Sequence, residues 1–380
     1  MNQIYKEKNM SKKYYSLQDI LKTNCTFNIL LGQKGNGKSY AVKDYLLYIA
    51  YHEADPFTGK PEPEYQFGYF RRWDLENTAG NVEQYFADFI LNDDGRERIK
   101  EITEGEYSTI VCWQKKIYFA NIDEKGKAIR GKLIGYSFSV ARTTKYSSLA
   151  YPLIGRGVYE EFITTEGYQP NEPSKLVILL STIFRRRDGK LFLVGNTMSR
   201  DCPYFSEWQL VNVPRQKQGT IDIYHQKTDS GEISIAVENC DQIQMENKLI
   251  IGRRTKMITP GQWDSEEQPH LPEPLEHYII KHVFFIRSEL LTYMGRILKK
   301  GPELLLYICP HTRDIKDPEH TRILERGFDL NILHNSRLLT DKLKYDLIIS
   351  EMIRLDRICY SDNLTGTEFK SLLKKEGNFA

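Results

Sequence analysis

Residues 27–41 read FNILLGQKGNGKSYA. An apolar run ends at Gly32, and residues 32–39 match the phosphate-loop pattern G-x-x-x-x-G-K-[ST] in full. Apolar residues at helical spacing follow over residues 38–51. Such glycines let successive backbone N–H groups turn inward around phosphate oxygens at the positive end of a helix. The stretch therefore predicts a nucleoside-triphosphate site between a strand and a helix. The alternative is a glycine-rich turn with a surface lysine.

The side chains of this loop have distinct predicted tasks. Lys38 would reach the β- and γ-phosphates, and the Ser39 hydroxyl would ligate Mg²⁺. ATP with Mg²⁺ is therefore the predicted ligand. The residues assigned to ATP binding are Gly32, Gln33, Lys34, Gly35, Asn36, Gly37, Lys38, Ser39 and Tyr40.

The residues around the loop alternate between short strands and helices. That alternation is typical of an α/β fold, in which a mostly parallel sheet is covered on both faces. The expected strands are residues 27–31, 66–71, 108–113, 116–122, 132–140, 153–159 and 190–194. The expected helices are residues 38–51, 81–90 and 173–187.

The second half of the chain changes character. Two short strands, 221–225 and 232–237, flank an Asp-Ser-Gly turn, and we interpret them as part of a small connecting subdomain. The remaining expected elements are a strand at 248–253, a Pro-rich linker at 260–274, strands at 278–286, 289–298 and 304–308, and an amphipathic helix at 341–358. The predicted domains are residues 1–210, 211–258 and 259–380.

Composition excludes several classes of protein. Of the 380 residues, 40% are hydrophobic and 27% are charged, which excludes collagen, a coiled-coil rod and a mostly disordered chain. No run approaches the ~18 apolar residues of a membrane span, and the N-terminus lacks the apolar core of a secretion signal. The six cysteines lie far apart, which favours free thiols in a reducing cytoplasm. The net charge of +2 neither demands nor excludes a nucleic-acid partner.

An acidic pair follows the strand expected at 153–159. A P-loop enzyme that hydrolyses its nucleotide needs a carboxylate to hold Mg²⁺ through water and a group that orients the attacking water. Residues 158–162 read VYEEF, and parallel strands bring their carboxyl ends to one edge of the sheet. We therefore assign Glu160 to the metal and Glu161 to the water. The alternative is an ordinary solvated acidic turn.

Polar residues at three other element ends are weaker candidates. The helix expected at 173–187 ends in Arg185, Arg186 and Arg187, of which one is an arginine finger for a neighbouring subunit or all three are cations that complement the helix dipole. Asn196 follows a strand and either senses the γ-phosphate or simply makes a turn. Arg71 and Arg72 end the second strand and either contact phosphate or DNA or form a solvated pair. Asn171 is the expected N-cap of the helix.

These motifs, in this order, resemble those of the DNA-packaging ATPase of small tailed bacteriophages of the phi-29 kind. The resemblance covers about residues 15–210. The matching segments are NILLG through GKSYA (28–41), YFRR (69–72), AYP (150–152), VYEEFI (158–163), YxPNE (168–172), TIFR (182–185), NxxS (196–199) and PYF (203–205). The resemblance implies a RecA-like ATPase domain of the additional-strand, catalytic-glutamate type, then a small linker, then a ribonuclease-H-like domain related to terminase nucleases.

The same resemblance implies an ATP-driven motor. Members of this family form a homomeric ring, usually of five subunits, at the portal of the empty capsid and drive double-stranded DNA into it. A packaging RNA and a terminal protein on the DNA are further candidate partners, and the expected location is the host cytoplasm, transiently on the viral procapsid. Arg185 matches the arginine that reaches the neighbouring subunit's ATP, and Asn196 matches the motif that couples hydrolysis to motion.

Two features depart from the family pattern. The metal carboxylate is normally Asp, whereas Glu160 here is one methylene longer. The resemblance also fades after about residue 210. The C-terminal domain shows no evident two-metal carboxylate set, because Glu289 and Glu303 fall at strand beginnings and the other acidic candidates lie in a polar loop. Those candidates are Asp314, Asp317 and Glu319. We therefore expect a vestigial nuclease domain without nuclease activity.

Two other functions remain open on sequence grounds. The chain is alternatively a different P-loop ATPase, helicase-like or defence-associated, although no second Gly-Lys-Ser/Thr loop follows residue 260. It is alternatively a nucleotide-gated structural subunit that binds ATP without turning it over.

Overall fold

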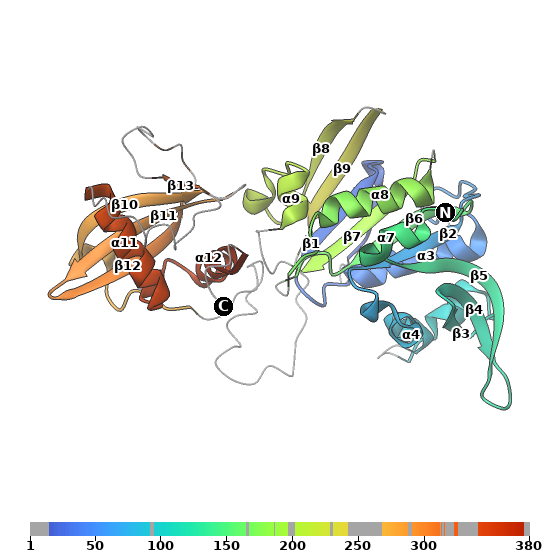
Figure 1. Ribbon diagram of the computed structural model, residues 1–380. Coiled ribbons are helices and arrows are strands. Elements are labelled where there is room, and N and C mark those ends of the chain that lie inside the picture. The colour runs from blue at the N-terminus through green and yellow to red at the C-terminus, as the bar shows by residue number, and fades with distance from the viewer. Residues whose placement is uncertain are drawn as a thin grey trace. The chain divides into compact units, whose positions relative to one another are not determined.

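Two sheets, each with its own apolar core, organise the computed structural model (Figure 1). One unit contains residues 1–197, 212–255 and 259–262, and the other contains 198–211, 256–258 and 263–380. The structure describes residues 15–91, 95–164, 167–185, 187–196, 202–228, 231–241, 268–287, 291–311, 313, 315, 323–325 and 341–375.

The first unit is built on a nine-stranded sheet. Its strands are β1 (Phe27–Gly32), β2 (Gln66–Arg71), β3 (Thr109–Trp113), β4 (Lys116–Ile122), β5 (Ala128–Ser139), β6 (Ile154–Glu160), β7 (Lys190–Asn196), β8 (Thr220–Thr228) and β9 (Gly231–Asn239), in the spatial order β3-β4-β5-β2-β6-β7-β1-β9-β8. In this spatial order the six strands β5-β2-β6-β7-β1-β9 pair in parallel with their neighbours. The pairs β3–β4, β4–β5 and β8–β9 are antiparallel. The parallel strands therefore bring their carboxyl ends to one edge, and β7 lies between β1 and β6.

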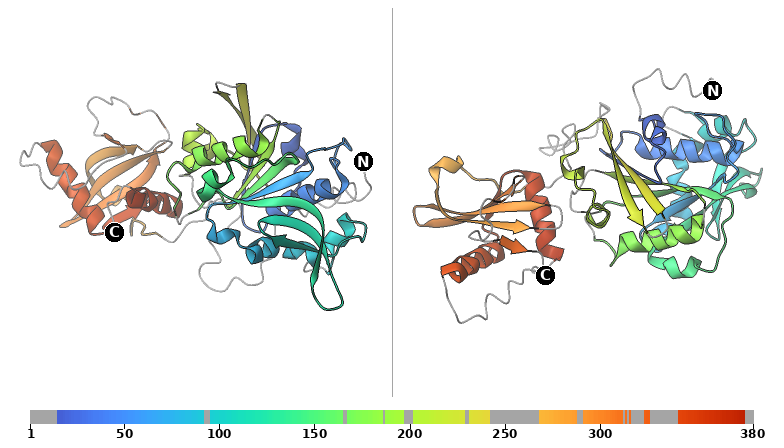
Figure 2. Two further views of the ribbon diagram at one scale, coloured as in Figure 1. Left: turned by 45° about the vertical axis from the view of Figure 1, so that its right-hand side comes forward. Right: turned by 90° about the horizontal axis from the view of Figure 1, so that it is seen from above.

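Helices cover both faces of this sheet. They are α2 (Gln18–Lys22), α3 (Lys38–His52), α4 (Ala79–Tyr85), α5 (Ala87–Ile90), α6 (Arg98–Ile102), α7 (Thr143–Tyr146) and α8 (Glu172–Phe184). Right-handed connections place α3 and α8 on opposite faces, because β1 to β2 and β6 to β7 step in opposite directions along the sheet (Figure 2). Every residue of β1 and β6 is buried, as expected for central strands with a layer on each side.

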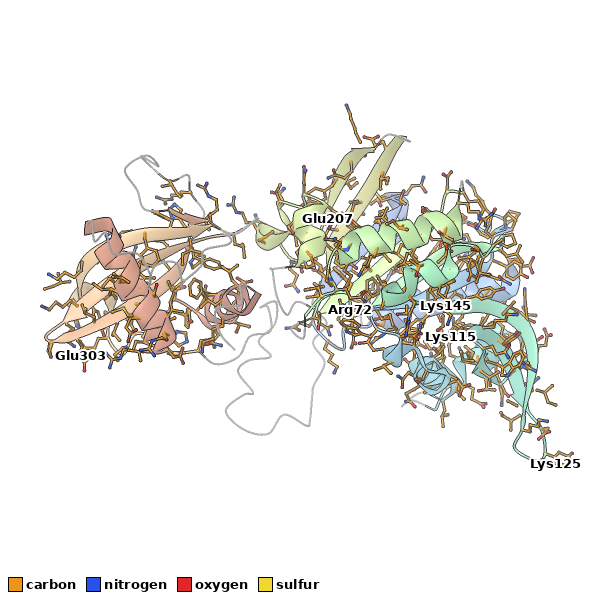
Figure 3. The ribbon with its side chains drawn as sticks, viewed as in Figure 1. Arg72, Lys115, Lys125, Lys145, Glu207 and Glu303 are labelled. Carbon is orange, nitrogen blue, oxygen red and sulfur yellow. The ribbon has the colours of Figure 1, made fainter. Side chains whose placement is uncertain are left out.

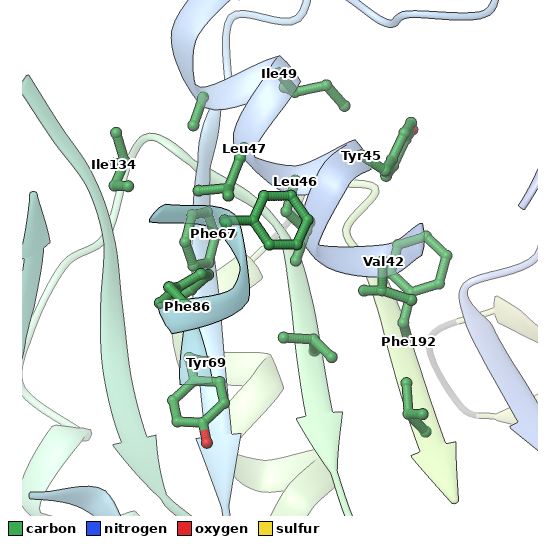
Figure 4. Packing of buried hydrophobic residues seen from close by; sticks show 14 of the residues in the cluster. Val42, Tyr45, Leu46, Leu47, Ile49, Phe67, Tyr69, Phe86, Ile134 and Phe192 are labelled. Carbon is green, nitrogen blue, oxygen red and sulfur yellow. The ribbon is translucent and has the colours of Figure 1, made fainter. Parts of the chain in front are cut away.

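The main core lies between α3 and the sheet (Figure 4). Val42 and Leu46 of α3 are fully buried or nearly so, and they belong to the same apolar cluster as Phe67 of β2 and Phe192 of β7. Phe86, between α4 and α5, belongs to this cluster as well. The core therefore joins the helix that follows the phosphate loop to the strands on both sides of the acidic pair.

Several predicted elements differ at their ends. The helix expected at 81–90 is two short helices, α4 and α5, because the backbone of Phe86 leaves the helical region at φ −100° and ψ 3°. The helix expected at 173–187 ends at Phe184, because Arg185 takes a positive φ of 53°. Asn171 occupies the N-cap position of α8, but its side chain makes no capping hydrogen bond. The short helices α6 and α7 were not expected.

The hairpin of β8 and β9 extends the main sheet, which corrects its interpretation as part of a connecting subdomain. Strand β9 pairs in parallel with β1, with Phe27 opposite Ile235. Ile235, Ala236 and Val237 are buried in this pairing. Without β9, the edge of β1 would leave its backbone N–H and C=O groups unpaired. The strand expected at 248–253 lies outside the described residues, and the domain boundaries at 210 and 258 stay a prediction.

Among its described residues, the second unit contains a five-stranded sheet and three α-helices. Its elements are α9 (Pro203–Glu207), β10 (Ile279–Arg287), β11 (Thr292–Lys300), β12 (Glu303–His311), β13 (Ile323–Glu325), α11 (Asp341–Arg354), β14 (Ile358–Tyr360) and α12 (Asn363–Lys375). Strands β10, β11 and β12 form an antiparallel meander, while β13 pairs in parallel with β10 and β14 pairs in parallel with β12. The helix expected at 341–358 ends at Arg354, and β14 follows it.

The core of this unit contains Phe284, Ile297, Leu306, Ile349 and Phe369, which come from β10, β11, β12, α11 and α12. Among the described residues, no helix has the length and apolar character needed to cross a membrane.

Candidate nucleotide-binding site

The phosphate loop connects β1 directly to α3. Gly35 and Gly37 have φ values of 87° and 92°, a left-handed conformation that favours glycine. At Gly32, an added Cβ would lie 2.8 Å from the side-chain nitrogen of Asn36, so the loop also needs a glycine for close approach. Both requirements explain why the sequence has glycines at these positions. The loop therefore has the strand–loop–helix context that its pattern predicted.

Lys38 is folded back onto its own loop. The side chain is only 4% exposed, and its ammonium donates to the Gln33 carbonyl at 2.7 Å and to Asn36 Oδ1 at 3.0 Å. Burial lowers the pKa of Lys38 to about 8. The Asn36 side-chain nitrogen is buried and has no hydrogen-bond partner among the described residues. An ammonium and an amide donor in a glycine-rich loop at a helix N-terminus fit a phosphate group.

Glu160 lies next to this loop, at the carboxyl end of β6. Its carboxylate is 6% exposed and accepts hydrogen bonds from Ser39 Oγ at 3.1 Å and from the Tyr85 hydroxyl at 2.6 Å. Burial raises the pKa of Glu160, while these two hydroxyl donors oppose the rise. The structure thus brings together the two residues predicted to hold Mg²⁺. An oxygen-only donor pair of hydroxyl and carboxylate fits that ion.

Glu161 is held by an arginine from the neighbouring strand. Arg71 ends β2, and its guanidinium contacts Glu161 Oε2 at 2.8 Å and Glu76 Oε2 at 3.3 Å. The Glu161 side chain is 65% exposed, and its backbone has a φ of 56°. Arg71 therefore faces the acidic pair, at the edge of the sheet where the phosphate loop lies.

Arg72 has a different role from Arg71. It is 5% exposed, pairs with the fully buried Glu172 at 2.8 Å, and donates to the carbonyls of Glu161 and Phe162 at 3.2 and 2.7 Å. Figure 3 labels Arg72 within the first unit. These three bonds disfavour the hypothesis that Arg72 contacts phosphate or DNA, because they direct its guanidinium to the loop after β6 and to Glu172. It fixes the backbone that carries Glu161.

Arg185 lies far from its own phosphate loop. Helix α8 starts near the carboxyl end of β6 and leads to the amino end of β7, where Lys190 pairs with Arg156. Arg185 at the end of α8 is therefore at the opposite edge of the sheet. Its exposed side chain donates to the Leu149 carbonyl at 3.0 Å.

Asn196 lies at the same edge as the phosphate loop. It ends β7 and pairs in register with Gly32, while Val194 of the same strand pairs with Glu160. The end of β7 is therefore placed between the start of the phosphate loop and the acidic pair.

Sequence reasoning missed two residues of this site, Tyr85 and Lys43. Tyr85 belongs to α4 and bonds Glu160, and Lys43 of α3 donates to the Tyr85 carbonyl at 2.8 Å and to Asp88. No local motif marks them. The one available signal is that Lys43 follows Ser39 by one helical turn and therefore lies on the same face of α3.

Comparisons with known proteins bear on the whole arrangement. No family model matches the chain. Over 204 residues the chain is 30% identical to the DNA packaging proteins of Bacillus phages PZA and phi29, and over 190 residues it is 30% identical to that of Bacillus phage B103. The first two matches cover 52% of this chain and 51% of each relative. The chain thus spans about half the length of the curated relatives it matches.

Solved structures give more distant likenesses. The bacteriophage Phi-29 viral genome packaging motor assembly has a TM-score of 0.49 and 19% identity, covering 96% of this chain and 100% of that one. The N-terminal domain of the DNA packaging ATPase from bacteriophage phi29 has a TM-score of 0.40 and 25% identity, covering 58% and 95%. The resemblance first seen in the motifs is confirmed by the sequence relatives: over about half of its length, this chain is similar to the DNA packaging proteins of Bacillus phages of the phi29 kind.

Proposed function

We propose that this chain is an ATP-driven motor that moves double-stranded viral DNA into a preformed capsid. The observation that carries the proposal is the contact between Ser39 and Glu160, with Glu161 next in the chain. It supports a metal-binding pair and a candidate base beside the phosphate loop. Similarity to phage DNA packaging proteins over half the chain supports DNA as the substrate and a capsid as its destination.

The residues of the site have defined tasks in this proposal. The glycine-rich loop binds the phosphates, and Lys38 leaves its partners in the loop for the β- and γ-phosphates. Ser39 and Glu160 hold Mg²⁺, which when bound neutralises charge that develops on the phosphate oxygens. Glu161 orients the attacking water and accepts its proton. Asn196 is placed to respond when the γ-phosphate leaves.

The contact between Arg71 and Glu161 defines an inactive state of the site, in which Glu161 is bonded to Arg71 and not to the attacking water. A carboxylate bonded to a guanidinium has one oxygen occupied and is a weaker base. Glu161 must therefore exchange Arg71 for water before hydrolysis. The same contact favours the competing function, a subunit that binds nucleotide without turning it over.

Arg185 points to a shared site. It lies at the opposite edge of the sheet from its own phosphate loop, and its exposed side chain can reach a second copy if it leaves the Leu149 carbonyl. We propose that it stabilises γ-phosphate charge in the neighbouring subunit of a homomeric ring, five subunits in the phi-29 kind. The ring would act at the capsid portal in the host cytoplasm, with packaging RNA and a terminal protein as further candidate partners.

The fold proposal follows the strand order. Strand β7 between the phosphate-loop strand β1 and the acidic strand β6 supports a RecA-like domain of the additional-strand, catalytic-glutamate type. The meander β10–β12 with β13 parallel to β10 supports a ribonuclease-H-like second domain, although β14 lies beside β12. We propose that it lacks nuclease activity. Among the described residues no group of three His, Cys, Asp or Glu gathers, and Glu289, Asp314, Asp317 and Glu319 lie outside them.

Protection of DNA from added nuclease tests the function. The wild-type chain, double-stranded DNA and empty procapsids of a phi29-kind phage are mixed with ATP. Protected DNA that depends on ATP hydrolysis supports the motor. Nucleotide binding without hydrolysis or protection supports the structural subunit, and hydrolysis with DNA unwinding but no protection supports a helicase-like ATPase.

A further inference from the structure

The carboxylate of Glu160 is held at both of its oxygens by hydroxyl groups from different elements. Ser39 at the start of α3 donates to Oε2 at 3.1 Å, and Tyr85 at the end of α4 donates to Oε1 at 2.6 Å. The mechanism proposed above uses Ser39 and Glu160 and gives Tyr85 no task. The hydroxyl of Tyr85 nevertheless makes the shorter of the two bonds.

The Tyr85 hydroxyl is fixed in place by its surroundings. Lys43 donates to the Tyr85 carbonyl at 2.8 Å and to the two oxygens of Asp88 at 2.6 and 2.7 Å, so α3 is bonded to the end of α4 and to α5. The ring of Tyr85 packs against that of Tyr69 with centroids 4.6 Å apart. Contacts to its backbone carbonyl and to its ring therefore restrict the Tyr85 side chain to the conformation in which its hydroxyl bonds Glu160.

A glutamate at a metal position needs such a partner more than an aspartate does. Glu160 has one more rotatable bond than aspartate, so its carboxylate has more orientations to lose when it is fixed. Mg²⁺ requires near-ideal octahedral geometry, and a carboxylate with several accessible orientations satisfies that geometry poorly. A bond that occupies one oxygen removes most of this freedom and decides which oxygen remains for the ion.

We propose that Tyr85 is a positioning residue for Glu160: its O–H bond to Oε1 presents Oε2, the atom beside Ser39, to Mg²⁺ of the bound nucleotide. This inference rests on the proposed function, since it assigns Glu160 to the metal. Partners of this kind orient metal ligands, and their loss typically weakens metal affinity or activity by about 10–100-fold.

The test is Mn²⁺ binding, measured by electron paramagnetic resonance with a non-hydrolysable ATP analogue, in wild type and Tyr85→Phe. The substitution removes one oxygen and leaves the ring. We expect Mn²⁺ affinity to fall about 10-fold or more, while the analogue alone binds as in wild type. The control is Tyr45→Phe, which removes another hydroxyl bonded to a carboxylate, Asp55, in the same core. Affinity within twofold of wild type in Tyr85→Phe would overturn the proposal.

A second background separates positioning from a general structural role. Glu160→Asp withdraws the carboxylate by one methylene, out of reach of the Tyr85 hydroxyl. Adding Tyr85→Phe to Glu160→Asp should then change Mn²⁺ affinity by less than twofold. A further loss as large as in the wild-type background would mean that Tyr85 acts through packing, and would contradict the inference. If wild type itself binds no Mn²⁺ with the analogue, the proposed function fails as well.

Discussion

Arg71 and Glu161 form an ion pair of 2.8 Å between neighbouring strands, at the edge where the phosphate loop lies. The pair holds the carboxylate that we assign to the attacking water. Because the Glu161 side chain is 65% exposed, solvent weakens this pair, and its worth is at most about 1 kcal/mol. It is therefore a restraint that ligand binding can release.

Arg71→Gln should raise the rate of ATP hydrolysis in the absence of DNA by up to about fivefold, because an exposed ion pair is worth at most about 1 kcal/mol. Steady-state phosphate release measures it. Lys125→Ala is the control, since Lys125 lies at the tip of the β4–β5 hairpin (Figure 3). A fall in basal hydrolysis would mean that Arg71 assists the reaction and does not restrain it.

Lys38→Ala should reduce ATP hydrolysis by at least about a hundredfold, the loss typical of removing one preorganised donor from transition-state charge. Lys38 is the only buried cation of the phosphate loop, with 4% of its surface exposed, because the other lysine of the loop, Lys34, is exposed. Phosphate release is again the measurement, with nucleotide binding followed by fluorescence. Undiminished turnover would remove the loop from the mechanism.

The two glutamates should fail in different ways. Glu161→Gln should bind Mg²⁺ with ATP as wild type does and lose hydrolysis by about 10²–10⁴-fold, because the base is gone. Glu160→Gln should need more Mg²⁺ for half-maximal binding. Paired binding and turnover titrations distinguish them, and the reverse pattern would exchange the two assignments.

Arg185→Ala should bind ATP normally and lose hydrolysis by about 10³–10⁵-fold, the value of an arginine supplied by a neighbour. Mixed with Lys38→Ala, it should recover part of the activity. Each Arg185→Ala subunit keeps an intact phosphate loop and borrows the arginine of a Lys38→Ala neighbour. Wild-type turnover per subunit should also rise with protein concentration. Rings that assemble from the mixture and stay inactive would exclude a shared site.

The buried pair of Arg72 and Glu172 should matter for stability. Glu172→Gln should lower the free energy of unfolding of the first unit by about 3–5 kcal/mol, because Arg72 then keeps an uncompensated buried charge. Urea unfolding measures this loss. Asp19→Asn breaks the exposed pair with Lys22 and should cost no more than about 1 kcal/mol. Equal effects of the two changes would show that burial does not decide the cost.

Local patterns predicted the part of the site that is contiguous in sequence. The phosphate loop, the strand before it and the helix after it follow from glycine geometry and apolar spacing over residues 27–51. The strand ending at Glu160 follows from its apolar run. The pairing of Ser39 with Glu160 was expected because parallel strands share an edge.

Contacts between distant segments were beyond local patterns. Tyr85 meets Glu160 because α4 folds back over the edge of the sheet, and nothing around residue 85 signals that return. Arg71 and Arg72 look alike in sequence, but Arg71 is the last residue of β2 and contacts Glu161, whereas Arg72 is the first residue after the strand and is buried against Glu172. Strand β9 was misassigned because its partner β1 lies some two hundred residues earlier.

The central claim is that the edge of the sheet carrying Ser39, Glu160 and Glu161 hydrolyses ATP in response to DNA. The most direct measurement is the single-turnover rate of ATP hydrolysis with and without double-stranded DNA, for wild type and Glu161→Gln side by side. We predict that DNA accelerates the wild-type rate and that Glu161→Gln binds ATP but shows no turnover under either condition. Equal rates in the two proteins, or a wild type that binds ATP and never hydrolyses it, would contradict the account.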